Sequence, residues 1–196
     1  MNILLDDLPE AIEINGVEYA VNFDFRSGLA CILDMESSEL TDEEKAILLL
    51  RRIYGETIPD DVETAIKLVV KFLDGGKEQP EEENPFADNV RLYSFEKDAT
   101  LIYAAFRQTH GIDLQKADLH WWQFLALFMD LGADTGFCNL VNLRRRVNSG
   151  EASKEERQYA LKLGDTFTIV DPEDMLTEVD NENADLFDLL SKGECL

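Results

Sequence analysis

The alternation of apolar and polar residues predicts a β-hairpin near the N-terminus. Over residues 11–24, apolar and polar side chains nearly alternate on either side of Asn15-Gly16. Asn-Gly supplies the two positive φ angles of a type I′ turn, which joins two antiparallel strands. An isolated hairpin is only marginally stable in water, so we expect it to pack on the rest of the chain.

After the hairpin, the apolar residues take up helical spacing. Residues 25–35 predict a short helix, and Thr41-Asp-Glu-Glu44 is a capping box that opens another helix, over residues 46–54. From Val62 to Leu73 the apolar residues recur at i, i+3, i+4 and i+7, which predicts an amphipathic helix with Pro59 at its start.

The second half of the chain also has helical spacing. It predicts helices over residues 95–109, over residues 135–147 and from the capping box at Ser153 to about residue 167. Residues 119–131 are apolar at nearly every position, which is typical of a central core helix. The adjacent Trp121 and Trp122 fit burial in such a helix, and an exposed partner-binding pair is the alternative.

These elements predict a mainly α fold, with six or seven helices around a central apolar helix and an N-terminal β-hairpin. Residues 1–73 hold the hairpin and the first helices, and residues 74–89 are an acidic linker or loop with two glycines and two prolines. Residues 90–170 form a helical core, and residues 171–196 are an acidic tail. We expect one compact domain overall.

The charge of the chain changes the classes of partner to consider. Its 196 residues include 41 acidic and 18 basic ones, so the net charge is −23. Such a surface repels phosphate, which argues against binding to nucleic acid or to an anionic membrane. The middle of the chain, residues 99–170, is balanced, and the acidity lies on either side of it.

Neither a metal site nor a targeting segment is indicated. The three cysteines are widely spaced and never form CxxC, and the N-terminus lacks the basic start of a signal peptide. The longest apolar run, from Phe124 to Met129, is too short for a membrane span. We expect a cytoplasmic protein without metal or cofactor.

The chain carries no catalytic signature of the common nucleotide-binding, hydrolase or zinc-protease type, and we expect no enzyme. His110 and His120 lie at predicted helix ends, where structural roles are favoured. Residues 180–188 loosely resemble a calcium loop, but Asp185 stands where that loop requires glycine. An enzyme that uses clustered surface carboxylates is a further alternative.

Arg144, Arg145 and Arg146 are the candidate partner-binding residues because they form the only basic cluster in the chain. They end a predicted helix, where cations are stabilised by the helix dipole. They are suited to hold an acidic segment of the same chain or of a neighbour.

Five strings in the middle of the chain resemble a known family. They are Phe95-Glu-Lys-Asp-Ala99, Ile102-Tyr-Ala-Ala-Phe106, His110-Gly-Ile-Asp-Leu114, Leu119-His-Trp-Trp-Gln-Phe124 and Leu143-Arg-Arg. Together they resemble the tail-assembly chaperones of long-tailed phages and prophages of Gram-positive bacteria. The expected structural core of this motif consists of Phe95, Ile102, Phe106, Trp121, Trp122, Phe124 and Phe128.

The resemblance implies a non-enzymatic function. Such chaperones coat the helical tape-measure protein, keep it soluble and bring tail-tube subunits to it in the bacterial host cytoplasm, and they are not expected in the mature virion. We also expect self-association into a homo-oligomer. The alternative, which rests on the net charge alone, is an acidic DNA mimic that inhibits a host nucleic-acid-binding protein.

Overall fold

The computed structural model describes residues 2–77 and 91–169, and within them the fold is mainly helical, as predicted. The hairpin consists of β1 (Ala11–Ile14) and β2 (Val17–Ala20). The seven α-helices of the described residues are α1 (Phe25–Glu36), α2 (Asp42–Tyr54), α3 (Val62–Leu73), α4 (Ala99–His110), α5 (Trp121–Met129), α6 (Gly136–Asn148) and α7 (Lys154–Leu163). Most of the predicted acidic linker, residues 78–89, and the predicted acidic tail, residues 171–196, lie outside the described residues.

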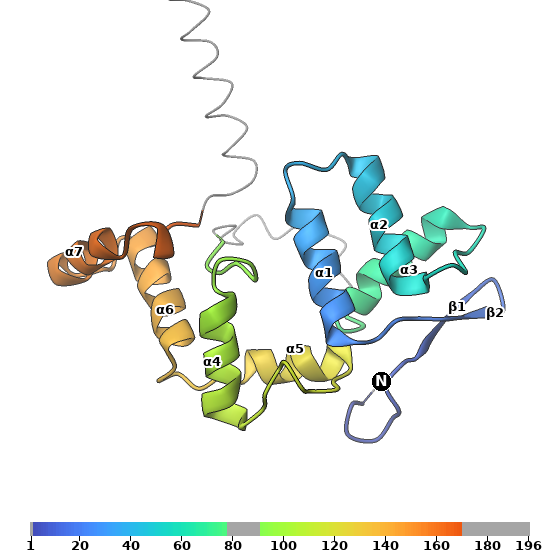
Figure 1. The fold of residues 1–196 in the computed structure, drawn as a ribbon, viewed down its shortest axis with the longest axis horizontal. Coiled ribbons are helices and arrows are strands. Elements are labelled where there is room, and N and C mark those ends of the chain that lie inside the picture. Colours follow the sequence, from blue (N-terminus) through green and yellow to red (C-terminus); the bar gives the residue numbers. More distant parts are fainter. Residues whose placement is uncertain (1, 78–90, 170–196) are drawn as a thin grey trace, which may run out of the picture.

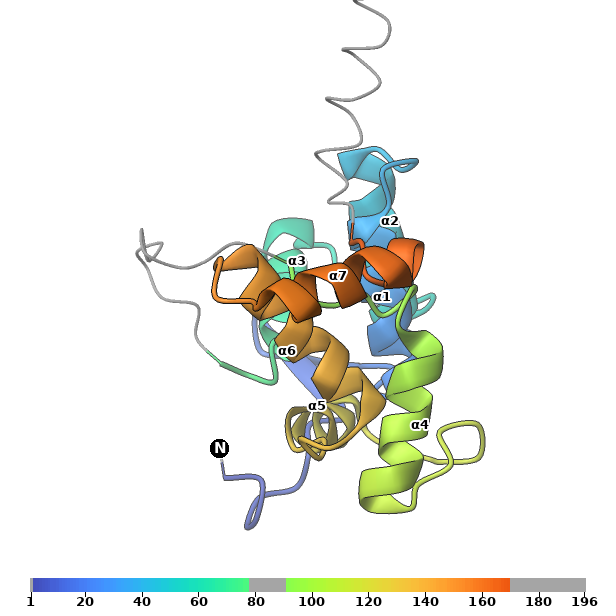
Figure 2. The same cartoon turned by 90° about the vertical axis from the view of Figure 1, so that its left-hand side faces the viewer.

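Helix α5 lies between two groups of elements (Figure 1). The hairpin and α1 to α3 stand on one side of it and form the N-terminal lobe, while α4, α6 and α7 form the C-terminal lobe. Figure 2 shows α5 nearly end-on, with α4 beside it. Helix α5 packs against both α1 and α4, and α7 packs on α6. The two lobes are therefore joined mainly through α5.

The hairpin forms as predicted, with Ala11 paired to Ala20 and Ile14 to Val17. Asn15 and Gly16 have φ angles of 52° and 80°, as the type I′ turn requires. The Asn15 amide donates a hydrogen bond to the Asp61 carboxylate, 3.1 Å away. Because Asp61 caps α3, the turn is tied to the helix behind it.

Capping side chains fix several helix starts. Both predicted capping boxes are present, Thr41 with Glu44 at α2 and Ser153 with Glu156 at α7. Helix α3 begins at Val62 and not at Pro59, because the Asp61 carboxylate accepts a hydrogen bond from the Thr64 N–H.

Helix α4 begins at Ala99, four residues later than the helical spacing from Phe95 predicts. The Ser94 hydroxyl accepts hydrogen bonds from the N–H groups of Glu96 and Lys97, and the Asp98 carboxylate accepts one from the N–H of Ser94. These bonds compete with helix formation, so residues 94–98 form a turn and Phe95 lies outside the helix.

Helix α5 is shorter than predicted because its start is paired with another segment. The Trp121 N–H donates to the Phe23 carbonyl, and the Phe25 N–H donates to the carbonyl of Leu119. His120 then caps the helix, because its Nδ1 accepts the Trp122 N–H at 3.0 Å. The helix is not enclosed on all sides, since Met129 is 81% exposed.

Aromatic rings around Phe124 form the centre of the core. The Phe124 ring stacks on Phe25 of α1, on Phe106 of α4 and on Trp121, with ring centroids 5.1, 5.1 and 5.6 Å apart. Since α1 and α4 belong to different lobes, this one ring joins both lobes.

The two tryptophans attach α5 to the end of α3. The Trp121 indole N–H donates to the Leu73 carbonyl at 2.9 Å, and the Trp122 indole N–H donates to that of Phe72 at 2.7 Å. These carbonyls lie in the last turn of α3, where i+4 helical donors run out, and the Phe72 carbonyl also accepts the Gly75 N–H at 3.1 Å. Gly28 of α1 leaves space for the Trp121 ring, since any Cβ at this position would collide with it.

The Gly28→Ala substitution is expected to destabilise the fold by about 1–3 kcal/mol, because the added methyl group overpacks against the buried Trp121 ring. Gly136→Ala is the matched control, since its Cβ would meet Leu101 at an ordinary 3.5 Å. Urea unfolding measures both variants. Equal stability of the two would contradict this packing.

Candidate protein-binding cleft

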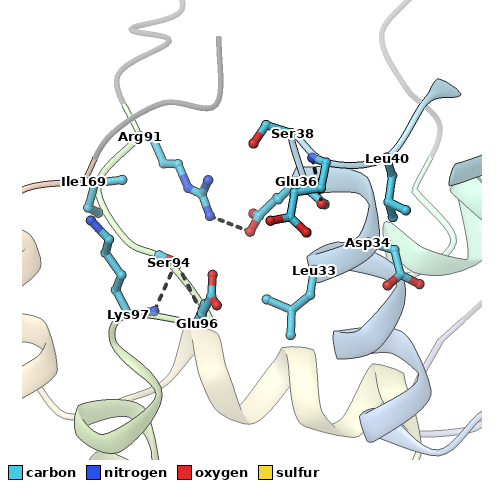
Figure 3. A pocket seen from close by; sticks show the side chains of 12 residues that line it. Leu33, Asp34, Glu36, Ser38, Leu40, Arg91, Ser94, Glu96, Lys97 and Ile169 are labelled. Atoms are coloured by element: carbon cyan, nitrogen blue, oxygen red, sulfur yellow. Dashed lines mark hydrogen bonds and ion pairs between the residues drawn. The ribbon is translucent and has the colours of Figure 1, made fainter. Parts of the chain in front are cut away.

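A groove of about 600 Å³ opens between the C-terminal end of α1 and the segment that precedes α4 (Figure 3). Three of its lining side chains are aliphatic: Leu33, Leu40 and Ile169. Six others are charged: Asp34, Glu36, Glu39, Arg91, Glu96 and Lys97. Charged side chains thus outnumber aliphatic ones in the groove, and Figure 3 shows Arg91 and Glu36 between Ile169 and Leu40.

The first wall belongs to α1 and is fixed to α2. The Asp34 carboxylate binds the Arg52 guanidinium of α2 through both of its oxygens, with Nη2 and Oδ1 3.0 Å apart. Leu33 keeps 38% of its surface exposed in the groove. Cys31 lies fully buried in the same helix, and burial raises the pKa of its thiol to about 12, so it stays protonated and serves packing.

The second wall is the non-helical segment at residues 91–98, which contains the turn described above for its Ser94 and Asp98 hydrogen bonds. Lys97 extends this wall toward the last described residues, because its ammonium group donates to the Thr168 carbonyl at 3.2 Å. Across the groove, Arg91 forms an ion pair with Glu36 of α1 at 2.5 Å. The pKa of Tyr93 is raised by burial and by the nearby Glu36 carboxylate, so its hydroxyl stays neutral.

Arg144 of α6 holds the second wall from behind. Its guanidinium binds both Asp98 oxygens, at 2.6 and 3.0 Å, and the two side chains are only 3% and 2% exposed. Its remaining N–H groups donate to the carbonyls of Leu92, Thr166 and Phe167. All five guanidinium N–H groups are therefore used within the chain.

A second cavity, of about 350 Å³, lies between the N-terminal end of α1 and α4. Phe25 and Leu29 of α1 line one side and Tyr103 of α4 the other, and Phe124 of α5 also contributes. The Tyr103 hydroxyl donates to Asp113 at 2.9 Å, which lowers the pKa of this carboxyl group. This cavity is more apolar than the groove.

The groove and the cavity follow the same helix. Leu29 lines the cavity and Leu33, one turn later, lines the groove, while Phe95 and Glu96 line the cavity and the groove on the opposite side. We call the two together the interlobe cleft. A cleft that combines aliphatic and aromatic side chains with charged ones is suited to bind a surface of another protein that has both apolar and charged groups.

The described residues contain no cluster of three or more histidine, cysteine, aspartate or glutamate side chains arranged to hold a metal ion. Nor does any helix among them combine the length and the apolar character of a membrane span.

Comparison with known proteins gives one match. The sequence-family model described as bacteriophage Gp15 protein matches residues 4–169. The chain belongs to the bacteriophage Gp15 protein family. Neither the curated proteins nor the solved structures yield a match. The matched range includes every residue that lines the interlobe cleft, so the cleft lies within the Gp15 part of the chain.

The three predicted partner-binding arginines of this Gp15 protein lie in different surroundings. Arg144 is buried and its N–H groups are fully used, so it supports the groove wall from inside. Arg145 is exposed, and Arg146 forms an ion pair with Glu156 of α7 at 2.6 Å. The sequence cluster is thus not one surface patch.

The expected core residues are placed around α5. Ile102, Phe106, Trp121, Phe124 and Phe128 are buried, and Phe95 and Trp122 are partly buried against the same core. Three of them, Phe95, Ile102 and Phe124, also line the second cavity. His120 is buried as the cap of α5, with its Nε2 3.0 Å from the Pro9 carbonyl, and His110 Nε2 lies 2.9 Å from that of Leu127. Both rings therefore have structural partners.

Sequence reasoning did not single out the groove residues Leu33, Glu39, Arg91 and Glu96. They come from segments more than 50 residues apart, and no local pattern marks them as neighbours. Leu33 gave no signal, because its sequence position fits the apolar spacing of the predicted helix and only the structure shows it exposed.

Replacing Arg144 by methionine is expected to cost about 3–5 kcal/mol of stability, because it leaves the buried Asp98 carboxylate without its partner. Arg145→Met is the matched control and is expected to change stability by less than about 0.5 kcal/mol. Urea unfolding compares the two. A loss of the same size in both variants would refute the special role of Arg144.

Proposed function

We propose that this Gp15-family protein is a phage tail-assembly chaperone that binds the tape-measure protein, keeps it soluble and helps bring tail-tube subunits to it. The proposal involves no catalysis. It places the protein in the host cytoplasm during assembly, as a homo-oligomer, and not in the mature virion.

The observation that carries the proposal is the interlobe cleft. A tape-measure protein exposes long apolar helical faces before the tail tube encloses it, and such faces aggregate unless another surface covers them. The cleft presents Leu29, Leu33 and Leu40 between charged side chains. An apolar helical face is a fitting occupant for such a site.

The charge of the chain supports the same proposal in a second way. A net charge of −23 keeps an apolar-binding protein soluble through mutual repulsion. It also lowers the affinity for phosphate-rich competitors in the host cell, so the chaperone stays available for protein partners.

Co-expression tests the proposal directly. With the tape-measure protein of the same phage or prophage, we expect the soluble fraction of that protein to rise several-fold and a complex to elute in size-exclusion chromatography. Failure of both, with the tape-measure protein equally soluble alone, would refute the chaperone function. Salt-sensitive binding to a basic host protein in its place would favour a DNA mimic.

Two leucines allow a matched test of the site. Leu33→Glu places a charge in the groove and is expected to abolish the gain in solubility, whereas Leu161→Glu, on the exposed face of α7, is expected to retain it. Both side chains are exposed enough for the variants to fold, which thermal unfolding checks. The reverse pattern would exclude the cleft as the binding site.

A further inference from the structure

The shape of the interlobe cleft favours a helix as its occupant. Its side walls come from α1 and from the turn and first residues of α4, and the described residues place no sheet edge along it. Along Leu29, Leu33 and Phe95, the apolar part of the lining, an extended segment would leave its backbone N–H and carbonyl groups without partners. A helix satisfies these groups internally and presents only side chains.

The length of α1 sets the scale of the contact. The cavity and the groove lie along this helix, which has 12 residues, so its face is about 18 Å long. A partner helix of about three turns covers this length. Its apolar stripe would meet Leu29 and Leu33 from one side and Phe95 from the other.

The charges of the groove predict which side chains stand beside the apolar stripe of that helix. Asp34 is paired with Arg52, and Glu36 with Arg91, while Lys97 binds a backbone carbonyl. Within the described part of the chain, Glu39 and Glu96 form no ion pair, and both line the groove, Glu39 from the loop after α1 and Glu96 from the segment before α4. Both side chains are exposed, so their carboxylates are accessible to basic side chains of a partner.

Building on the proposed function, we infer that the interlobe cleft binds one amphipathic helix of the tape-measure protein, with its apolar stripe between α1 and the wall at residues 91–98 and with basic residues beside Glu39 and Glu96. The apolar contact supplies most of the affinity, and the two carboxylates select which helix enters.

Two synthetic peptides test this inference on the full-length protein. Both are alanine-based, about 18 residues long and carry the same leucine stripe, but one has lysines beside the stripe and the other glutamates. We expect the lysine peptide to bind about tenfold more tightly at low salt, as fluorescence anisotropy measures, since two ion pairs replace two repulsions. High salt should reduce the difference.

Charge reversal tests whether the peptide preference comes from the two cleft glutamates or from the overall charge of the protein. The variant Glu39→Lys/Glu96→Lys should reverse the preference and bind the glutamate peptide more tightly. The control variant Glu10→Lys/Glu56→Lys makes the same change in net charge at exposed positions outside the cleft and should keep the preference for lysine. Equal behaviour of the two variants would overturn the inference.

The remaining outcomes distinguish this inference from the proposed function. If the tape-measure complex forms but neither peptide binds, or the cleft variants leave that complex unchanged, the helix inference fails and the chaperone function stands. If Leu33→Glu converts an oligomer into monomers, as light scattering measures, the cleft binds a second copy of this chain and the inference is wrong. If no tape-measure complex forms at all, the proposed function fails first.

Discussion

The buried contact between the Arg144 guanidinium and the Asp98 carboxylate joins three segments that are distant in sequence. It fixes the start of α4 to α6, and through the carbonyls of Leu92, Thr166 and Phe167 it also holds the chain before α4 and the last described residues. Burying two charges is costly, and a complete set of hydrogen bonds offsets this cost. One wall of the groove has no regular secondary structure, so its shape depends on this contact.

The cleft depends on helix α5 as well as on the contact between Arg144 and Asp98. Phe124 stacks on rings from α1 and α4, and the indole groups of Trp121 and Trp122 bind the end of α3. The lobes are held together at this level, while the groove lies between them farther along α1 (Figure 3). A cleft that exists before binding requires little ordering when a partner arrives, which favours affinity.

Local signals predicted the parts of the fold that local chemistry determines. Asn15-Gly16 indicated the hairpin, and Thr41 with Glu44 indicated the start of α2. Periodicity failed at Phe95, because the hydrogen bonds of Ser94 and Asp98 compete with the helix and leave no trace in hydrophobic spacing. The spacing of apolar residues could have distinguished Arg144 from the two arginines that follow it. Arg144 continues the helical spacing of Phe137 and Leu140, which lie on the buried face of α6. The cleft itself was beyond prediction, since packing alone brings α1 to the turn before α4.

The central claim, that the interlobe cleft receives the tape-measure protein, is tested most directly by hydrogen exchange with mass spectrometry on the complex of the two proteins. The amides of residues 37–41 and 91–98 lie in non-helical segments at the groove, where a bound helix would exclude water. We predict slower exchange in both segments on binding, with no change in α7. Protection confined to α7 or to the hairpin, with both groove segments unchanged, would contradict the account.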